Sequence, residues 1–205
     1  MKNRFTVSRK AATNNMKKML IIMLWSVGWS GHFSAAQSKC AALTGGQVSG
    51  HVYTNKDLGL SYTFPESLKA ESQDKLPKNK NSRLLLVLWK EPRDLGKPSI
   101  IILADDLSQY PDPTVTGYLR TIVNMAKRYN PPATVLEVGR QYDLSGIKFY
   151  RVDYEFPSPT PAYNVAITSQ MQNCEISFDF TGRTKQEVET FVQSIDTVRF
   201  ARPKR

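Results

Sequence analysis

Carboxylate side chains gather where an apolar run gives way to a polar segment. Asp105, Asp106 and Asp112 follow the run Ser99–Leu103 and precede a helical pattern. Three carboxylates that converge could hold calcium or magnesium, because both ions prefer oxygen ligands. The spacing lacks the Asp-x-Asp-x-Asp-Gly pattern of a calcium loop, and aspartate is also common in turns and helix caps. These residues are weak metal candidates, and no cofactor is expected.

A second acidic pair lies on a strand. Asp153 and Glu155 are two positions apart, so their side chains share one face of that strand. General acid–base pairs can have this arrangement. Arg151 shares the face, however, and opposite charges side by side favour a surface ion-pair ladder.

Histidine chemistry is nearly excluded. His32 falls in a leader described below, which leaves only His51. Histidine is the usual base for a serine or cysteine nucleophile and the commonest zinc ligand. A histidine-rich metal site is therefore impossible, and any triad would have to use His51, which fits an exposed strand end better. We assign no catalytic residue.

The N-terminal segment has the pattern of a secretory signal peptide. Two lysines precede the apolar run Met19–Trp25, and small residues follow up to Ala36. We expect cleavage between Ala36 and Gln37 and export by the general secretory route, since the leader has no Arg-Arg pair. The run is short for a membrane span, but an uncleaved anchor is the alternative. Translation could start at Met1 or Met16.

The basic charge of the chain belongs mainly to this leader. Residues 1–36 carry six basic side chains and no acidic one, so the net charge of +10 falls to +4 after cleavage. A charge this mild argues against a nucleic-acid partner. The 169 residues that remain suit one domain.

Two cysteines remain after cleavage, Cys40 and Cys174. An even count in an exported chain predicts one disulfide. Cys40 lies near the mature N-terminus, where a covalent tether would hold the chain end in place. The alternative is a pair of free thiols, with Cys174 on the apolar face that Ile176 and Phe178 share.

Hydrophobic patterns divide the mature chain into strands and two helices. Strands are expected at 51–54, 60–64, 84–89, 99–103, 135–142, 149–156, 163–167 and 174–180, and helices at 114–129 and 185–195. The continuous apolar runs at 84–89 and 99–103 predict strands covered on both faces. The capping box Thr184–Glu187 marks the start of the last helix.

The connecting segments complete the domain plan. Turns are expected at 55–59, 91–96 and 172–173, a stiff crossing loop at 157–161, and a basic, solvated loop at 66–83. Residues 37–50 form a flexible lead-in, 51–200 one globular domain and 201–205 a basic tail. The element order predicts an α+β fold, with an antiparallel β-sheet covered by helices as an α/β/α sandwich.

The opening hairpin resembles that of the PsbP-like fold family. Tyr53-Thr54-Asn55 and Gly59-Leu60-Ser61-Tyr62-Thr63-Phe64-Pro65 are similar to the family's aromatic strand that ends in proline. The element order and the closing helix before Val198-Arg199-Phe200 agree, so the resemblance covers about residues 50–200. The family includes the extrinsic PsbP protein of photosystem II, the Ran guanine-nucleotide release factor and many exported bacterial proteins of unknown role. No metal-binding or Ran-contact motif is present, so none of the family's functional residues carries over.

These observations favour an exported, non-enzymatic binding or accessory domain, periplasmic or extracellular, with another envelope or secreted protein as its partner. No stable membrane insertion is expected after cleavage. Two alternatives remain: a carboxylate-dependent metal-binding hydrolase that uses Asp105, Asp106 and Asp112, and an envelope structural protein tethered by an uncleaved leader.

Overall fold

The computed structural model describes Cys40 and residues 42–77, 79–91, 98–157, 162–171 and 174–201. All of these belong to the second of two compact units, residues 36–205. The expected signal peptide, its cleavage site and the alternative starts lie outside the described residues. So do residues 172–173, most of the expected turn at 91–96, most of the crossing loop at 157–161 and residues 202–205.

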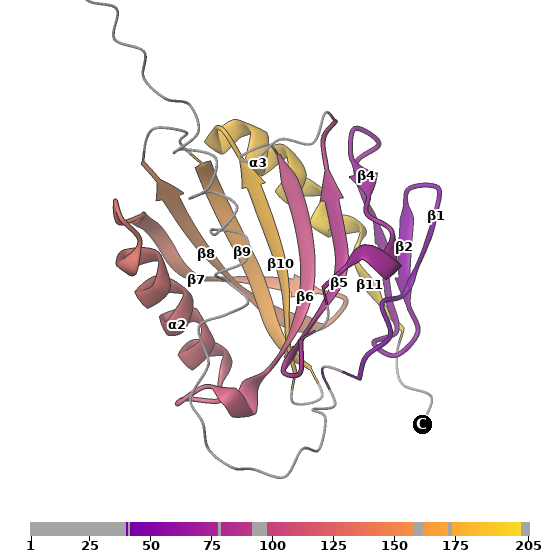
Figure 1. The fold of residues 1–205 in the computed structure, drawn as a ribbon, viewed down its shortest axis with the longest axis horizontal. Helices are drawn as coiled ribbons and strands as arrows, with labels where there is room; N and C mark the ends of the chain where they lie inside the picture. Colours follow the sequence, from indigo (N-terminus) through magenta and orange to yellow (C-terminus); the bar gives the residue numbers. More distant parts are fainter. Residues whose placement is uncertain are drawn as a thin grey trace, which may run out of the picture. The chain divides into compact units, whose positions relative to one another are not determined.

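Two antiparallel sheets make up most of the fold (Figure 1). The smaller sheet has the order β1-β2-β3-β11, from β1 (Gln47–Ser49), β2 (Val52–Asn55), β3 (Leu60–Thr63) and β11 (Arg199–Phe200). The larger has the order β4-β5-β6-β10-β9-β8-β7, from β4 (Lys69–Ala70), β5 (Ser82–Trp89), β6 (Ser99–Asp106), β7 (Thr134–Leu144), β8 (Ile147–Phe156), β9 (Ala162–Met171) and β10 (Cys174–Gly182). The predicted antiparallel α+β class is confirmed.

Both predicted helices form where their capping residues place them. Thr114 accepts a hydrogen bond from the Gly117 amide at the start of α2 (Val115–Arg128). Thr184 accepts one from the Glu187 amide at the start of α3 (Lys185–Val192), and the Glu187 carboxylate accepts one from the Arg183 amide. These bonds satisfy amides that the first helical turn leaves without a partner. Short 3-10 helices occupy η1 (Gln73–Lys75), η2 (Leu107–Gln109) and η3 (Gln193–Thr197).

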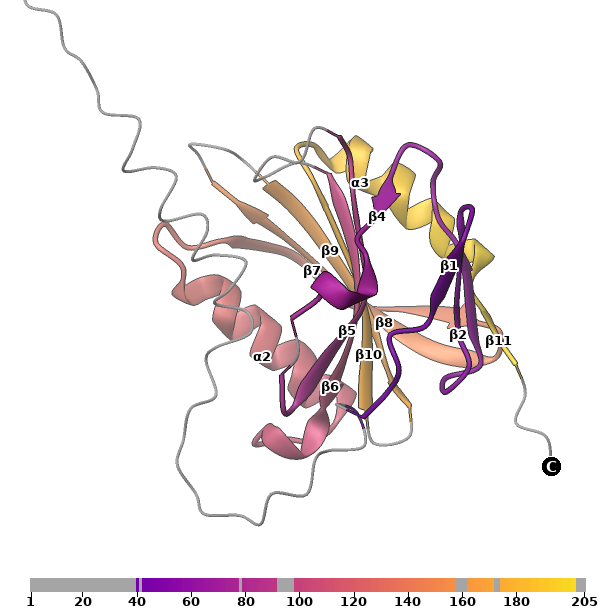
Figure 2. The same ribbon diagram turned by 45° about the vertical axis from the view of Figure 1, so that its right-hand side comes forward.

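The two faces of the seven-stranded sheet have different covers (Figure 2). On one face, α3 and the four-stranded sheet enclose the apolar core, in which Tyr62 meets Phe178 edge to face and Phe191 is buried. On the other face, α2 packs on β7, β8 and β9. The cover expected from an α/β/α sandwich is thus only partly helical, because the aromatic opening hairpin folds onto the sheet instead of extending it.

Strands β5 and β6 are buried less evenly than their composition predicts. In β6, Ile100, Ile102 and Ala104 are fully buried, whereas Ile101 and Leu103 on the α2 side are only partly so. The expectation of cover on both faces holds for one face alone. The reason is positional, since α2 contacts the β7–β9 half of the sheet.

The segment before the first predicted strand is tied down at several points. The predicted disulfide joins Cys40 to Cys174 at the start of β10, with a Cα–Cα distance of 5.6 Å and a separation of 134 residues. Both sulfur-bearing residues are buried in the apolar core. Thr44 donates to Asp57 through its amide at 2.7 Å and its hydroxyl at 2.8 Å. The stretch expected to be a flexible lead-in therefore includes β1.

Turn and loop regions also carry more structure than their composition suggests. Gly59, the last residue of the predicted turn after β2, has φ of 62°, a left-handed conformation that glycine adopts without a steric penalty. The polar stretch 66–83, expected to be a solvated connection, contains β4 and η1. Gln73 of η1 donates to the Leu85 carbonyl at 2.7 Å, which fixes this loop on β5.

Breaking the disulfide should destabilise the fold without abolishing it. The Cys40→Ser/Cys174→Ser variant should lose about 2–4 kcal/mol of unfolding free energy, because a long loop is no longer closed in the unfolded chain. Urea unfolding measures the change, and the wild-type protein under reductant should match the variant. Equal stability of oxidised and reduced wild-type protein would contradict the prediction.

Candidate functional site

The three aspartates expected near one another have separate roles. Asp105 faces α2 and accepts hydrogen bonds from the hydroxyls of Tyr118 at 3.0 Å and Tyr110 at 3.1 Å. Asp106 follows it on the strand, so its side chain lies on the opposite face. There it caps η2 by accepting from the Ser108 amide at 3.0 Å.

Asp112 belongs to the loop before α2. It accepts a hydrogen bond from the Thr114 hydroxyl at 2.7 Å and pairs with Arg120 at 3.6 Å. Asp105 and Asp106 thus lie on opposite faces of the sheet and Asp112 lies in a loop, so the three carboxylates have different partners. Across the described ranges between Cys40 and Ala201, no group of three histidine, cysteine or acidic side chains could hold a metal ion.

Asp105 instead lies beside two acidic residues of β10. The β6–β10 register places it directly opposite Glu175, and Asp179 shares the same face of β10. We name Asp105, Glu175 and Asp179 the carboxylate cluster. Glu175 is fully buried, and the two aspartates are partly buried. The cluster therefore sits on the α2 side of the sheet, away from the apolar core.

Hydroxyl groups supply most of the polar contacts of this cluster. Thr168 of β9 donates to one carboxylate oxygen of Glu175, and Ser177 donates to Asp179 at 2.5 Å. The other Glu175 oxygen, Oε2, is buried and accepts no hydrogen bond from the described residues. A buried, unpaired carboxylate oxygen is costly in the ionised form, and protonation lowers that cost.

The electrostatics of the cluster favour the neutral acids. Burial, together with the nearby Asp105 and Asp179 carboxylates, raises the pKa of Glu175 to about 8. Burial raises the pKa of Asp179 to about 7, against the lowering effect of the Ser177 hydrogen bond. The pKa of Asp105 is also raised by burial, although the Tyr118 and Tyr110 hydroxyls oppose the shift. At neutral pH the cluster therefore retains protons.

A second polar group lies on the α3 side of the sheet. We name Arg151, Asp153, Glu189, Tyr142 and Tyr163 the arginine cluster. The Arg151 guanidinium donates to Asp153 at 2.5 and 2.7 Å and to both carboxylate oxygens of Glu189 on α3. Tyr163 donates to Asp153 at 3.0 Å, and the guanidinium donates to Tyr142 at 3.0 Å.

The ion-pair ladder of Arg151 and Asp153 was predicted at the surface, but it is buried. Arg151 is only 1% exposed and Asp153 3%, while Glu155 on the same strand is exposed. The ladder is buried because α3 packs on β9 and β10 and brings Glu189 over this face. Burial alone would lower the pKa of Arg151, but the hydrogen bonds that it donates to Asp153, Glu189 and Tyr142 raise this pKa overall. The charged form is thus held inside the fold.

No family model and no curated protein matches this chain. Among solved structures, cyanobacterial PsbP (CyanoP) from Synechocystis sp. PCC 6803 superimposes with a TM-score of 0.52. The match covers 85% of this chain and 98% of that one, at 11% sequence identity. The chain has a PsbP-like fold. The sequence resemblance in the opening hairpin therefore predicted the architecture.

Other solved structures match the PsbP-like fold of this chain less closely. A protein of unknown function from Pseudomonas aeruginosa has 13% identity and a TM-score of 0.43, covering 75% of this chain and 97% of its own. LpqN of Mycobacterium tuberculosis, described as involved in cell envelope biogenesis, has 14% identity and a TM-score of 0.37, covering 64% and 80%. At these identities the likeness concerns the fold alone.

The sequence contained one signal for the carboxylate cluster on this PsbP-like sheet. Glu175, Ser177 and Asp179 alternate with apolar residues along β10. Such alternation is typical of a strand with one face in water. The alternating pattern did not predict the cluster, because it gives no sign that α2, a helix far away in the sequence, lies on the side of Glu175 and Asp179. Tyr110 and Tyr118 complete the site from the segment between β6 and α2.

The arginine cluster should stabilise the PsbP-like fold strongly. Arg151→Met leaves Asp153 buried without its cation, so we expect a loss of about 3–5 kcal/mol in unfolding free energy. The matched variant Arg151→Met/Asp153→Leu removes both charges and should lose less. Urea unfolding at pH 7 measures both. A single-variant loss below about 1 kcal/mol, the range of exposed pairs, would contradict this role.

Proposed function

We propose that the chain is an exported, non-enzymatic binding or accessory domain that contacts another envelope or secreted protein. Its most unusual ionisable groups are engaged with one another inside the fold, on both sides of one sheet. The carboxylates that a metal-dependent hydrolase would use are not gathered around a common point. These arrangements support a binding role over catalysis.

The observation that carries the proposal is the position of the exposed apolar side chains. Leu136 and Val138 on β7 are 47% and 52% exposed. β7 is an edge strand of the seven-stranded sheet. Exposed apolar groups that lie together are typical of interaction sites. We therefore propose this edge as the contact surface for the partner.

The local shape of β7 favours contact through side chains over addition of another strand. Its pairing with β8 shifts register between Val135 and Glu137 and again between Val138 and Arg140. Gly139 in the second irregularity has φ of 89°. Bulges of this kind bend an edge away from regular strand pairing. The partner would meet Leu136 and Val138 as an apolar patch on this edge.

Export is supported by the leader pattern together with the Cys40–Cys174 bond, because disulfides persist in oxidising compartments. In the described part of the chain, neither helix has the length and apolarity that a membrane crossing requires. A domain carried outside the cytosol would meet its partner in the envelope or beyond it.

Substitution of the β7 patch should abolish partner recovery. Leu136→Ser/Val138→Ser removes the apolar contact while exposed positions usually change stability little. Val48→Ser/Val52→Ser is the matched control, since both valines are exposed, on β1 and β2 of the other sheet. Cross-linked envelope extracts should yield one partner with the wild type and the control only. Equal recovery with the β7 variant would contradict the proposed surface.

The mass of the exported protein tests its processing. We expect a chain that begins at Gln37 and gains about 2 Da on reduction, as one disulfide takes up two hydrogens. Intact-mass spectrometry of protein from the cell envelope makes both measurements. A chain that still begins at Met1 or Met16 would favour the tethered alternative.

A further inference from the structure

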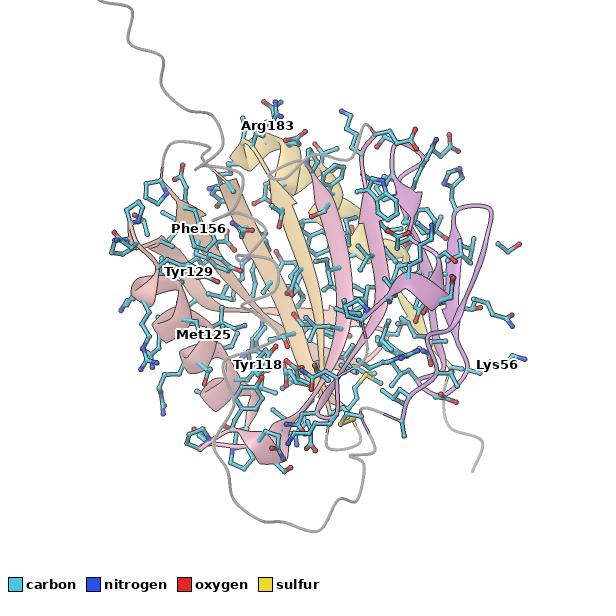
Figure 3. All side chains as sticks on the ribbon, in the orientation of Figure 1. Lys56, Tyr118, Met125, Tyr129, Phe156 and Arg183 are labelled. Carbon is cyan, nitrogen blue, oxygen red and sulfur yellow. A yellow bond between two sulfur atoms is a disulfide. The ribbon has the colours of Figure 1, made fainter. Side chains whose placement is uncertain are left out.

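Two consecutive elements are attached to the sheet through one carboxylate oxygen. Tyr110, directly after η2, and Tyr118, in the first turns of α2, both donate to Asp105 Oδ2. Their rings also meet edge to face, with centroids 5.1 Å apart. Tyr118 lies on the sheet side of α2, as do Met125 and Tyr129 further along (Figure 3). The tyrosine side chains therefore attach η2 and the start of α2 to the carboxylate cluster at Asp105.

Among the described residues, the groups around the cluster are acids, hydroxyls and one amide, without a counter-cation. They are Asp105 from β6, Glu175, Ser177 and Asp179 from β10, Thr168 and Gln170 from β9, Tyr154 from β8, Ser82 from β5, and Tyr110 and Tyr118 from the covering segment. Asp106 adds a further negative charge from the opposite face. The cations of α2, Arg120, Lys127 and Arg128, are exposed, and Arg120 pairs with Asp112.

We infer that η2 and the N-terminal half of α2 form a proton-operated latch, which is closed while Glu175 and Asp179 hold protons and opens when they ionise. Ionised Glu175 would place a buried negative charge directly opposite Asp105, the residue that accepts from both tyrosines. The buried Oε2 atom of Glu175 has no donor among the described residues to stabilise that charge. Opening lets water reach the acids and solvate their charges.

The direction of the pH effect follows from proton linkage. With the latch closed, burial raises the pKa of Glu175 to about 8 and that of Asp179 to about 7. With the latch open, both acids return to ordinary values of about 4. The open state therefore binds fewer protons between about pH 4 and 8, and the closed state loses stability as pH rises through that window. Each proton released changes the opening equilibrium by up to about tenfold per pH unit.

The opposite face of the sheet should not respond. There the Asp153 and Glu189 carboxylates are matched by the Arg151 guanidinium, which stays charged throughout this range. α3 is attached by that cluster and by apolar packing of Val188 and Phe191. A latch thus predicts loss of order in α2 alone, whereas simple destabilisation would affect both helices.

Amide hydrogen exchange of the full-length protein from pH 5 to pH 8 tests this inference. After correction for intrinsic rates, protection of the α2 amides should fall by up to about a hundredfold per pH unit where Glu175 and Asp179 each release a proton on opening. Protection of α3 should change much less. Constant protection of α2, or an equal loss in α2 and α3, would overturn the latch.

Neutral variants assign the effect to its residues. Glu175→Gln/Asp179→Asn keeps the side-chain shapes and should remove the part of the pH dependence that these two acids cause, leaving at most that of Asp105, whose pKa burial also raises. Glu155→Gln, which removes an exposed carboxylate from β8, should keep the wild-type dependence. A double variant with the full wild-type slope would overturn the assignment. If that variant does not fold, carboxyl-carbon NMR of the wild type decides: midpoints above pH 6 for Glu175 and Asp179 support the latch, and midpoints near 4 overturn it.

Discussion

Burial of β10 on both faces is the constraint on which the other layers depend. One row of its side chains, with Phe178 and Phe180, meets α3 and the four-stranded sheet. The other row contains Glu175 and Asp179 and lies toward α2. A buried acid is tolerated only when it is neutralised or hydrogen-bonded. The segments that cover the two faces must therefore stabilise different side chains of β10 and its neighbours.

The two faces illustrate the two available solutions. On the α3 side, Arg151 provides a fixed positive charge between Asp153 and Glu189, so its pairing does not depend on pH near neutrality. On the α2 side, hydroxyls and bound protons provide the compensation, and the balance changes with pH. The same sheet thus combines a permanently paired charge cluster with one that responds to its surroundings. The β7 edge presents Leu136 and Val138 to the solvent.

Sequence patterns predicted most elements because their signals are local. The period of apolar residues, the caps Thr114 and Thr184 and the turn glycine Gly59 each act within a few positions. The site was predicted less well. The sequence identifies Asp105 but groups it with its sequence neighbours Asp106 and Asp112. Its true neighbour is Glu175, on a strand that is adjacent in the sheet but far away in the sequence. Cross-strand neighbours depend on sheet order, which a single sequence does not reveal.

The sequence by itself determined the leader pattern, the antiparallel α+β class, the single pair of cysteines and the scarcity of histidine, because composition and local spacing suffice for these. Only the tertiary structure decided that Arg151 and Asp153 are inside, that the carboxylate cluster lies toward α2, and that a second sheet replaces part of the helical cover. An alternating strand specifies two faces but not what covers them. What covers each face depends on the packing of segments far apart in the chain. The charge state of every buried acid depends on the same packing.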